Sequence, residues 1–110
     1  MEKVNSKEYW EERFVSGDWD HYDGDLQSAF FSQIALDAFP AWLDQELARH
    51  EWTVFDVGCA EGGGTAALAR RFPSCHTVGI DVSETAVKRA GKKYPFCQFL
   101  QGDVYTQKEP

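Results

Sequence analysis

The chain has 110 residues, which is enough for one compact domain and too few for two separate hydrophobic cores. Its content of 43% hydrophobic, 15% aromatic and 26% charged residues is typical of a folded globular domain and argues against intrinsic disorder. Because 11 Lys and Arg stand against 18 Asp and Glu, the formal net charge of -7 disfavours nucleic acid and anionic membranes as partners.

The cysteines and the N-terminus indicate where such a chain would work. Cys59, Cys75 and Cys97 show no CxxC spacing and form no metal-ligand spacing with the histidines, which predicts reduced thiols and no metal site. The charged start, MEKVNSKEYW, lacks an apolar signal segment, and no apolar run reaches the roughly 18 residues that a membrane span needs. We therefore expect a soluble, cytoplasmic protein with no membrane partner.

The first 50 residues predict helices and one loop. Ser6 is a suitable cap for a short helix that continues to Phe14, and the acidic, glycine-containing loop over residues 16–25 is predicted to be irregular. Apolar residues at helical spacing predict a second helix over residues 26–38, which Pro40 ends. A third helix is predicted over residues 41–49.

From residue 51 the pattern changes to alternating strands and helices. Runs rich in β-branched and aromatic residues predict strands over residues 52–57, 75–80 and 96–100, and the segments between them have one apolar helical face. This βαβαβ order implies parallel strands with right-handed crossovers. The expected fold class is α/β, namely a Rossmann-like three-layer α/β/α arrangement with an incomplete parallel sheet of about three strands, preceded by N-terminal helices.

The predicted sheet is incomplete, because the polar tail from Tyr105 to Pro110 contains no further strand. A sheet of this size leaves an apolar strand edge exposed, which favours pairing with other strands. We therefore expect either an N-terminal part of a longer protein or self-association through the exposed sheet edge.

The segment VFDVGCAEGGGT, residues 54–65, is the most informative part of the sequence. It predicts a buried strand, a glycine-rich turn and the start of a helix, an arrangement that holds nucleotide-type ligands at the free N-H groups of the helix N-terminus. Gly58 and the run from Gly62 to Gly64 allow a ligand to approach the backbone closely. Asp56, at the end of the strand, is unfavourable beside a pyrophosphate and favourable beside a cation.

Three acids stand at the carboxyl ends of the three predicted strands: Asp56, Asp81 and Asp103. The carboxyl ends of parallel strands meet at one edge of a sheet, so we expect these acids to line one rim of the binding crevice. A carboxylate accepts hydrogen bonds from ribose hydroxyls, which suits Asp81, or from the adenine amino group, which suits Asp103. The pattern favours a cationic ligand that has an adenosine end and no phosphate.

These motifs resemble those of the class I S-adenosylmethionine-dependent methyltransferases over residues 54–104. In the family's glycine motif, D/E-x-G-x-G-x-G, Asp56, Gly58 and Gly62 match, whereas Ala60 replaces the middle glycine. The segment GIDVSETAVKRA, residues 79–90, looks like the family's second element, which is an acid at the end of the second strand followed by a helix. The segment QGDV, residues 101–104, looks like the third element.

The resemblance implies transfer of a methyl group from S-adenosylmethionine to an unidentified acceptor. It assigns the backbone of Gly58, Cys59 and Ala60 to the methionine part of the cofactor, and Asp56 to the orientation of the turn and to the cofactor's ammonium group. The same resemblance assigns Asp81 to the ribose hydroxyls.

The adenine end of the cofactor is assigned in the same way. The resemblance places Asp103 and the N-H of Val104 at the adenine edge and packs Val82 on the ring. It also implies a helical lid or cap over residues 1–50, in which Trp10 to Phe14 and the loop through Tyr22 cover the site, and the N-terminal half of the cofactor-binding domain over residues 51–110. Catalytic residues and the acceptor are not predicted.

Other interpretations remain open at this point. Gly58, Ala60 and Gly63 fit a loose dinucleotide fingerprint, so an NAD(P)-dependent oxidoreductase is an alternative, and a non-catalytic binding or assembly module is another. Asp56 and Asp103 could simply stabilise turns. The thiol of Cys59, at a helix N-terminus, could have a lowered pKa.

Overall fold

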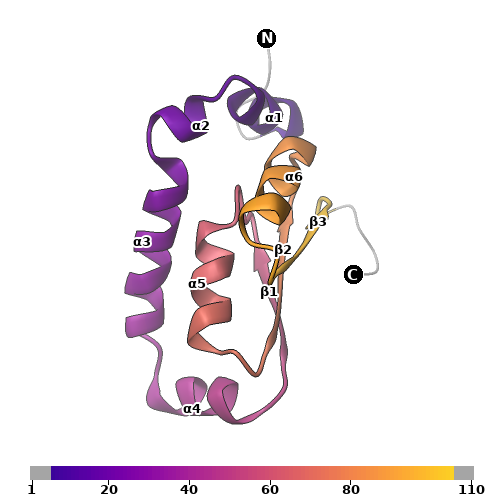
Figure 1. The fold of residues 1–110 in the computed structure, drawn as a ribbon. Helices are drawn as coiled ribbons and strands as arrows, with labels where there is room; N and C mark the ends of the chain where they lie inside the picture. Colours follow the sequence, from indigo (N-terminus) through magenta and orange to yellow (C-terminus); the bar gives the residue numbers. More distant parts are fainter. Residues whose placement is uncertain (1–5, 106–110) are drawn as a thin grey trace.

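The computed structural model describes residues 6–105. The helices are α1 (Lys7–Val15), α2 (Asp18–His21), α3 (Gly24–Asp37), α4 (Ala41–Arg49), α5 (Gly63–Arg71) and α6 (Glu84–Lys93), and the strands are β1 (Thr53–Val57), β2 (His76–Asp81) and β3 (Gln98–Gln101) (Figure 1). The first five residues, which are half of the charged start MEKVNSKEYW, and the part of the polar tail after Tyr105 lie outside the described residues. None of the helices in this part of the chain is long and apolar enough to cross a bilayer.

The N-terminal helices follow the predicted pattern except in one segment. The Ser6 hydroxyl accepts a hydrogen bond from the Tyr9 N-H at 3.1 Å and caps α1, and α4 has the predicted bounds. The prediction of an irregular loop over residues 16–25 was wrong, because α2 forms within it and α3 begins at Gly24. Gly17, with φ of 84°, turns the chain between α1 and α2, so the glycine separates two helices instead of opening a loop.

The predicted parallel sheet is confirmed. The strands lie in the order β1-β2-β3, and Asp56 of β1 is in register with Gly79 of β2, while Asp81 of β2 is in register with Gln101 of β3. The helix α6 begins after Ser83, whose hydroxyl accepts a hydrogen bond from the Ala86 N-H at 3.1 Å. This register brings the carboxyl ends of the strands to one edge of the sheet.

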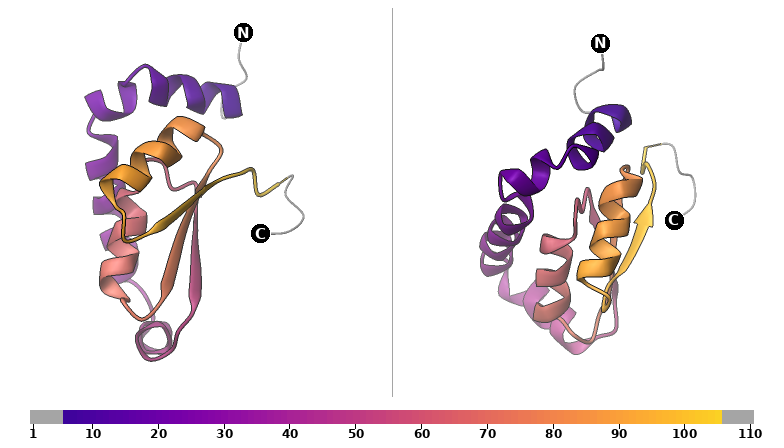
Figure 2. Two further views of the ribbon diagram at one scale, coloured as in Figure 1. Left: turned by 45° about the vertical axis from the view of Figure 1, so that its right-hand side comes forward. Right: turned by 45° about the horizontal axis from the view of Figure 1, so that its top comes forward.

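The crossover helices α5 and α6 lie on the same face of the sheet, and α3 packs against α5 (Figures 1 and 2). Right-handed crossovers between strands that advance in one direction require this placement. On β1, Phe55 and Val57 are 45% and 58% exposed. The α/β fold is thus confirmed, and the described residues contain the helices of one face of the sheet.

The helix α1 lies beside α6, near the carboxyl ends of the strands (Figure 1). Its Phe14 is only 1% exposed and forms a buried cluster with Ala60 of the glycine turn and Ala86 of α6, while Trp10 and Trp19 pack against this cluster. Burial of these aromatic rings holds the N-terminal helices over the turn that follows β1.

Candidate functional site

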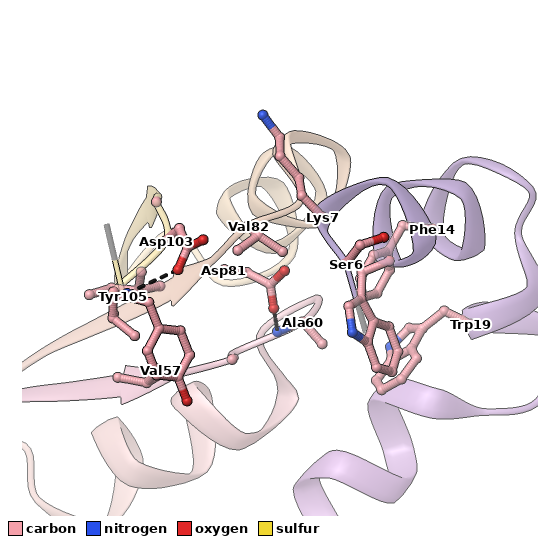
Figure 3. Close-up of a pocket in the computed structure, with 15 residues that line it drawn as sticks. Ser6, Lys7, Phe14, Trp19, Val57, Ala60, Asp81, Val82, Asp103 and Tyr105 are labelled. Carbon is pink, nitrogen blue, oxygen red and sulfur yellow. Dashed lines mark hydrogen bonds between the residues drawn. The ribbon is translucent and has the colours of Figure 1, made fainter. Parts of the chain in front are cut away.

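A cavity of about 420 Å³ lies at the carboxyl ends of the strands (Figure 3). Six of the nine predicted site residues line it: Gly58, Ala60, Asp81, Val82, Asp103 and Val104. The N-terminal segment completes the wall with Phe14 and Trp19. We call this space the first cavity. It is built from the ends of all three strands and from the predicted lid segment.

Asp56 lies in a different place from the other two acids. It lines a second cavity of about 440 Å³ together with Arg13, Cys59 and polar residues of α3. Gly58 and Trp19 line both cavities, so the two spaces adjoin at these residues. The expected single rim of three acids is thus divided, because Asp81 and Asp103 share the first cavity and Asp56 stands in the second.

Gly62 lines neither of these two cavities. Its φ is 97°, and a Cβ atom there would lie 2.9 Å from the ring of Phe99. Glycine is required at this position by the left-handed backbone conformation and by contact with β3. Gly58 also has a positive φ, 77°, but a Cβ atom there would meet nothing within 4 Å, so the space in front of it is open to a ligand.

The Asp81 carboxylate holds the glycine turn in shape. One oxygen accepts a hydrogen bond from the Ala60 N-H at 2.9 Å and the other accepts from the Ser83 N-H at 3.0 Å, and the residue is 9% exposed. A carboxylate has about four acceptor sites, so each oxygen can accept a further hydrogen bond from a ligand. Asp81 therefore combines a structural role with a position in the first cavity.

Several backbone N-H groups of the turn already have acceptors within the protein. Those of Gly58 and Cys59 donate to the carbonyl of Ile80 at 2.7 and 3.0 Å, and that of Gly63 donates to the Asp25 carboxylate at 2.7 Å. At the helix N-terminus, where free N-H groups were expected, the N-H of Gly63 is thus taken by an acid from α3. A phosphate needs such donors. The turn instead offers oxygen acceptors, which suit a cation.

The surroundings of Asp56 disfavour its negative charge. Burial raises the pKa of this carboxyl group, the hydrogen bond from the Thr65 hydroxyl at 2.7 Å lowers it, and the nearby charge of Asp81 raises it, with a net increase. A cation bound beside Asp56 would relieve this cost.

The thiol of Cys59 is also affected by these two acids. Burial raises its pKa well above the ordinary value, and the charges of Asp81 and Asp56 raise it further. The alternative of a lowered pKa for the Cys59 thiol was therefore wrong. Burial and the two acids raise this pKa by more than the helix N-terminus lowers it.

Ala60 stands where the glycine motif has its middle glycine, and it has the backbone conformation of a glycine. Its φ is 52°, in the left-handed region that is unfavourable for residues with a Cβ atom. The residue is 6% exposed, and its methyl group belongs to the cluster with Phe14. Contact with the N-terminal segment thus offsets the backbone strain.

Glu61 is a residue of the turn that the sequence did not single out. It is fully buried, and its two oxygens lie 3.2 Å from Arg89 Nη1 and 2.6 Å from Lys93 Nζ. Arg89 and Lys93 both lie on α6. The pairing spans 28 and 32 residues, which leaves no local signal.

Within residues 6–105, three or more His, Cys, Asp or Glu side chains do not gather in a way that could hold a metal ion. Residues 54–110, more than half of the chain, match the sequence model described as "Methyltransferase domain". The chain belongs to this methyltransferase domain family. The resemblance to class I S-adenosylmethionine-dependent methyltransferases is confirmed.

Curated relatives match the same part of the chain. Trans-aconitate 2-methyltransferase of Yersinia pestis is 38% identical over 52 residues, which are 47% of this chain and 20% of the relative. The enzyme of the same name from Escherichia coli is 39% identical over 51 residues, which are 46% of this chain and 20% of the relative. The matched part thus spans about a fifth of the length of these relatives.

Solved structures support the fold over most of the chain. The plantazolicin methyltransferase BpumL, in complex with SAH, aligns with a TM-score of 0.66 at 20% identity and covers 94% of this chain and 40% of its own. DesVI of Streptomyces venezuelae aligns with a TM-score of 0.58 at 20% identity and covers 82% of this chain and 36% of its own. The N-terminal helices of this family member are thus part of the shared fold. The family match favours a methyltransferase over an NAD(P)-dependent oxidoreductase.

The strain at Ala60 leads to the first prediction. In the Ala60→Gly variant, relief of about 1–2 kcal/mol of backbone strain is offset by a more flexible unfolded chain and by the lost methyl burial. We expect the free energy of unfolding to change by less than about 0.5 kcal/mol, whereas Ala69→Gly in α5 costs about 1 kcal/mol. Urea unfolding measures both variants, and equal losses would show that Ala60 is not strained.

The raised pKa of Asp56 leads to the second prediction. The folded protein binds the proton of this group more tightly than the unfolded chain does, so its ionisation lowers stability as pH rises from about 4 through the higher folded-state pKa. The Asp56→Asn variant lacks this loss and keeps an acceptor for Thr65.

We expect the stability of Asp56→Asn relative to wild type to increase as the pH rises over that interval. At pH 7 the variant should have a higher free energy of unfolding than wild type. The matched control is Asp37→Asn, since the Asp37 side chain is 63% exposed and lies 3.6 Å from Arg71 in a surface ion pair. An Asp56→Asn variant that loses stability relative to wild type as pH rises would contradict the assignment.

Proposed function

We propose that the chain binds S-adenosylmethionine as part of an enzyme that transfers the cofactor's methyl group to an acceptor. The observation that carries this proposal is the cavity in which Asp81 and Asp103, at the ends of β2 and β3, lie together in front of a glycine turn several of whose N-H groups already have acceptors. Membership of the methyltransferase domain family supports the same function.

The residues present fit the chemistry of this cofactor. In the first cavity, Asp81 and Asp103 supply acceptors for ribose hydroxyls and for an adenine amino group, and Val82 and Val104 supply apolar surface for a ring. In the second cavity, Asp56 would hold the ammonium group. Open space in front of Gly58 joins the two cavities and would accommodate the chain between the two ends of the cofactor.

When bound, S-adenosylmethionine would supply a methyl group on a positively charged sulfur, for in-line transfer to an acceptor nucleophile with the sulfur leaving as a neutral thioether. The chain's own contribution is to orient the cofactor and to exclude water from it. We assign exclusion of water to the N-terminal segment, residues 1–50, acting as a lid over the half-domain of residues 51–110, because Phe14 and Trp19 already form one wall of the first cavity. The free cysteines in the described part of the chain support a reducing, cytoplasmic location.

The third prediction tests cofactor binding at Asp103. The Asp103→Ala variant should bind S-adenosylhomocysteine about tenfold or more weakly than wild type in calorimetric titration, because a hydrogen bond to a charged group is lost. Asp81 is less suitable, since its removal would also release the N-H groups of Ala60 and Ser83.

The control Asp37→Ala removes an exposed acid that lines neither cavity and should bind S-adenosylhomocysteine as wild type does. NAD, which carries a pyrophosphate, should give no binding heat. If the intact protein binds NAD and not S-adenosylhomocysteine, the proposed function is wrong.

A second candidate function is assembly through the edge of β1. In the described residues this strand pairs on one side only, with β2, and its Phe55 and Val57 are exposed. The fourth prediction is therefore self-association of the chain. Sedimentation at rising protein concentration should show dimers for wild type, and fewer dimers for Val57→Lys, since a charged edge disfavours strand pairing. A monomer at every concentration would contradict this role.

A further inference from the structure

Glu61 is a fully buried carboxylate within the glycine turn, between two residues of the family motif. It lines neither of the two cavities, so it does not face the proposed cofactor. A buried charge is costly unless it is paired and hydrogen-bonded. Here the cost is offset by Lys93 Nζ at 2.6 Å and by Arg89 Nη1 at 3.2 Å, both on α6.

The two cations that hold Glu61 also hold the N-terminal helices. Arg89 Nη1 donates a hydrogen bond to the carbonyl of Phe14, near the end of α1, at 2.6 Å. Lys93 Nζ lies 3.6 Å from Asp20 of α2 and 3.9 Å from Asp25 of α3. Through two side chains, one carboxylate of the glycine turn is therefore linked to all three of the first helices.

Asp25 closes the same network from the opposite side. Its carboxylate accepts hydrogen bonds from the Gly63 N-H at 2.7 Å and from the Tyr94 hydroxyl at 2.6 Å. The N-terminal helices and the glycine turn thus share their charged partners, and neither can move without disturbing the other. Both parts line the first cavity, the N-terminal helices with Phe14 and Trp19 and the glycine turn with Gly58 and Ala60.

We propose that Glu61 is a positioning residue for the cofactor, acting through Arg89 and Lys93 to keep Phe14 and Trp19 against the glycine turn. The inference rests on the proposed function, since it assigns Glu61 to the cavity in which the cofactor would bind. Loss of the carboxylate charge releases the N-terminal helices and opens the cavity wall, while the sheet keeps its own hydrogen bonds. Glu61 contacts no ligand itself.

The test uses the intact protein with Glu61→Gln, which keeps the shape of the side chain and one acceptor oxygen. Lys93 still has Asp20 and Asp25, and Arg89 still has the carbonyl of Phe14 and is 35% exposed, so the variant should fold. What the variant loses is the ion pair of both cations with the glycine turn, which fixes the N-terminal helices against it. Amide hydrogen exchange compares residues of α1 and α2 with residues of the strands, and calorimetry measures the affinity for S-adenosylhomocysteine.

We expect exchange in α1 and α2 to accelerate by about tenfold or more in Glu61→Gln, with strand exchange nearly unchanged. Binding of S-adenosylhomocysteine should weaken by a similar factor, and saturation with this ligand should restore the protection of α1 and α2. The control Glu84→Gln removes an exposed partner of Lys88 on the same helix and should change neither quantity.

Two results would overturn the proposal. Equal acceleration in helices and strands would show that Glu61 only supports the fold, and unchanged exchange in α1 and α2 would show that it does not hold the helices. Failure of the proposed function is separately visible, because wild type would then not bind S-adenosylhomocysteine at all. In that case a selective exchange effect would leave Glu61 as a link between helices and turn, and its cofactor role would be wrong.

Discussion

The hydrogen bonds of the Asp81 carboxylate are the constraint on which the rest of the site depends. They join the turn after β1 to the start of α6, across 21 residues, and they hold Ala60 in a left-handed conformation. The N-H groups before it are taken by Ile80 of the same strand as Asp81. A turn built in this way presents acceptors to its ligand, and for this reason it suits a cation better than a phosphate.

Asp56, Asp81 and Glu61 carry negative charges that are costly to remove from water. The structure treats these charges in two different ways. Asp56 and Asp81 raise the pKa of the Cys59 thiol, and Asp81 also raises the pKa of Asp56, so a cationic ligand would be favoured at this place. Glu61, by contrast, is neutralised within the protein by Arg89 and Lys93. The charge of Glu61 is thus balanced within the protein, whereas among the described residues no basic group lowers the pKa of Asp56 in the same way.

Local patterns predicted much of this architecture. The strands, the cap at Ser6 and the helix α4 depend on periodicity and capping, which act over a few residues. The helix α2 was missed, because a short acidic segment with two glycines has no apolar period. The separation of Asp56 from Asp81 and Asp103 was missed as well, since it depends on the N-terminal helices that divide the space above the sheet.

The sequence by itself determined the parallel sheet, the glycine turn and the presence of acids at the strand ends, because strand and helix signals are local and parallel strands align their carboxyl ends. Tertiary structure alone decided which N-H groups remain available to a ligand and which charges are buried. Those properties arise from contacts between residues far apart in the chain, such as Asp25 with Gly63 and Glu61 with Lys93, and no short pattern encodes them.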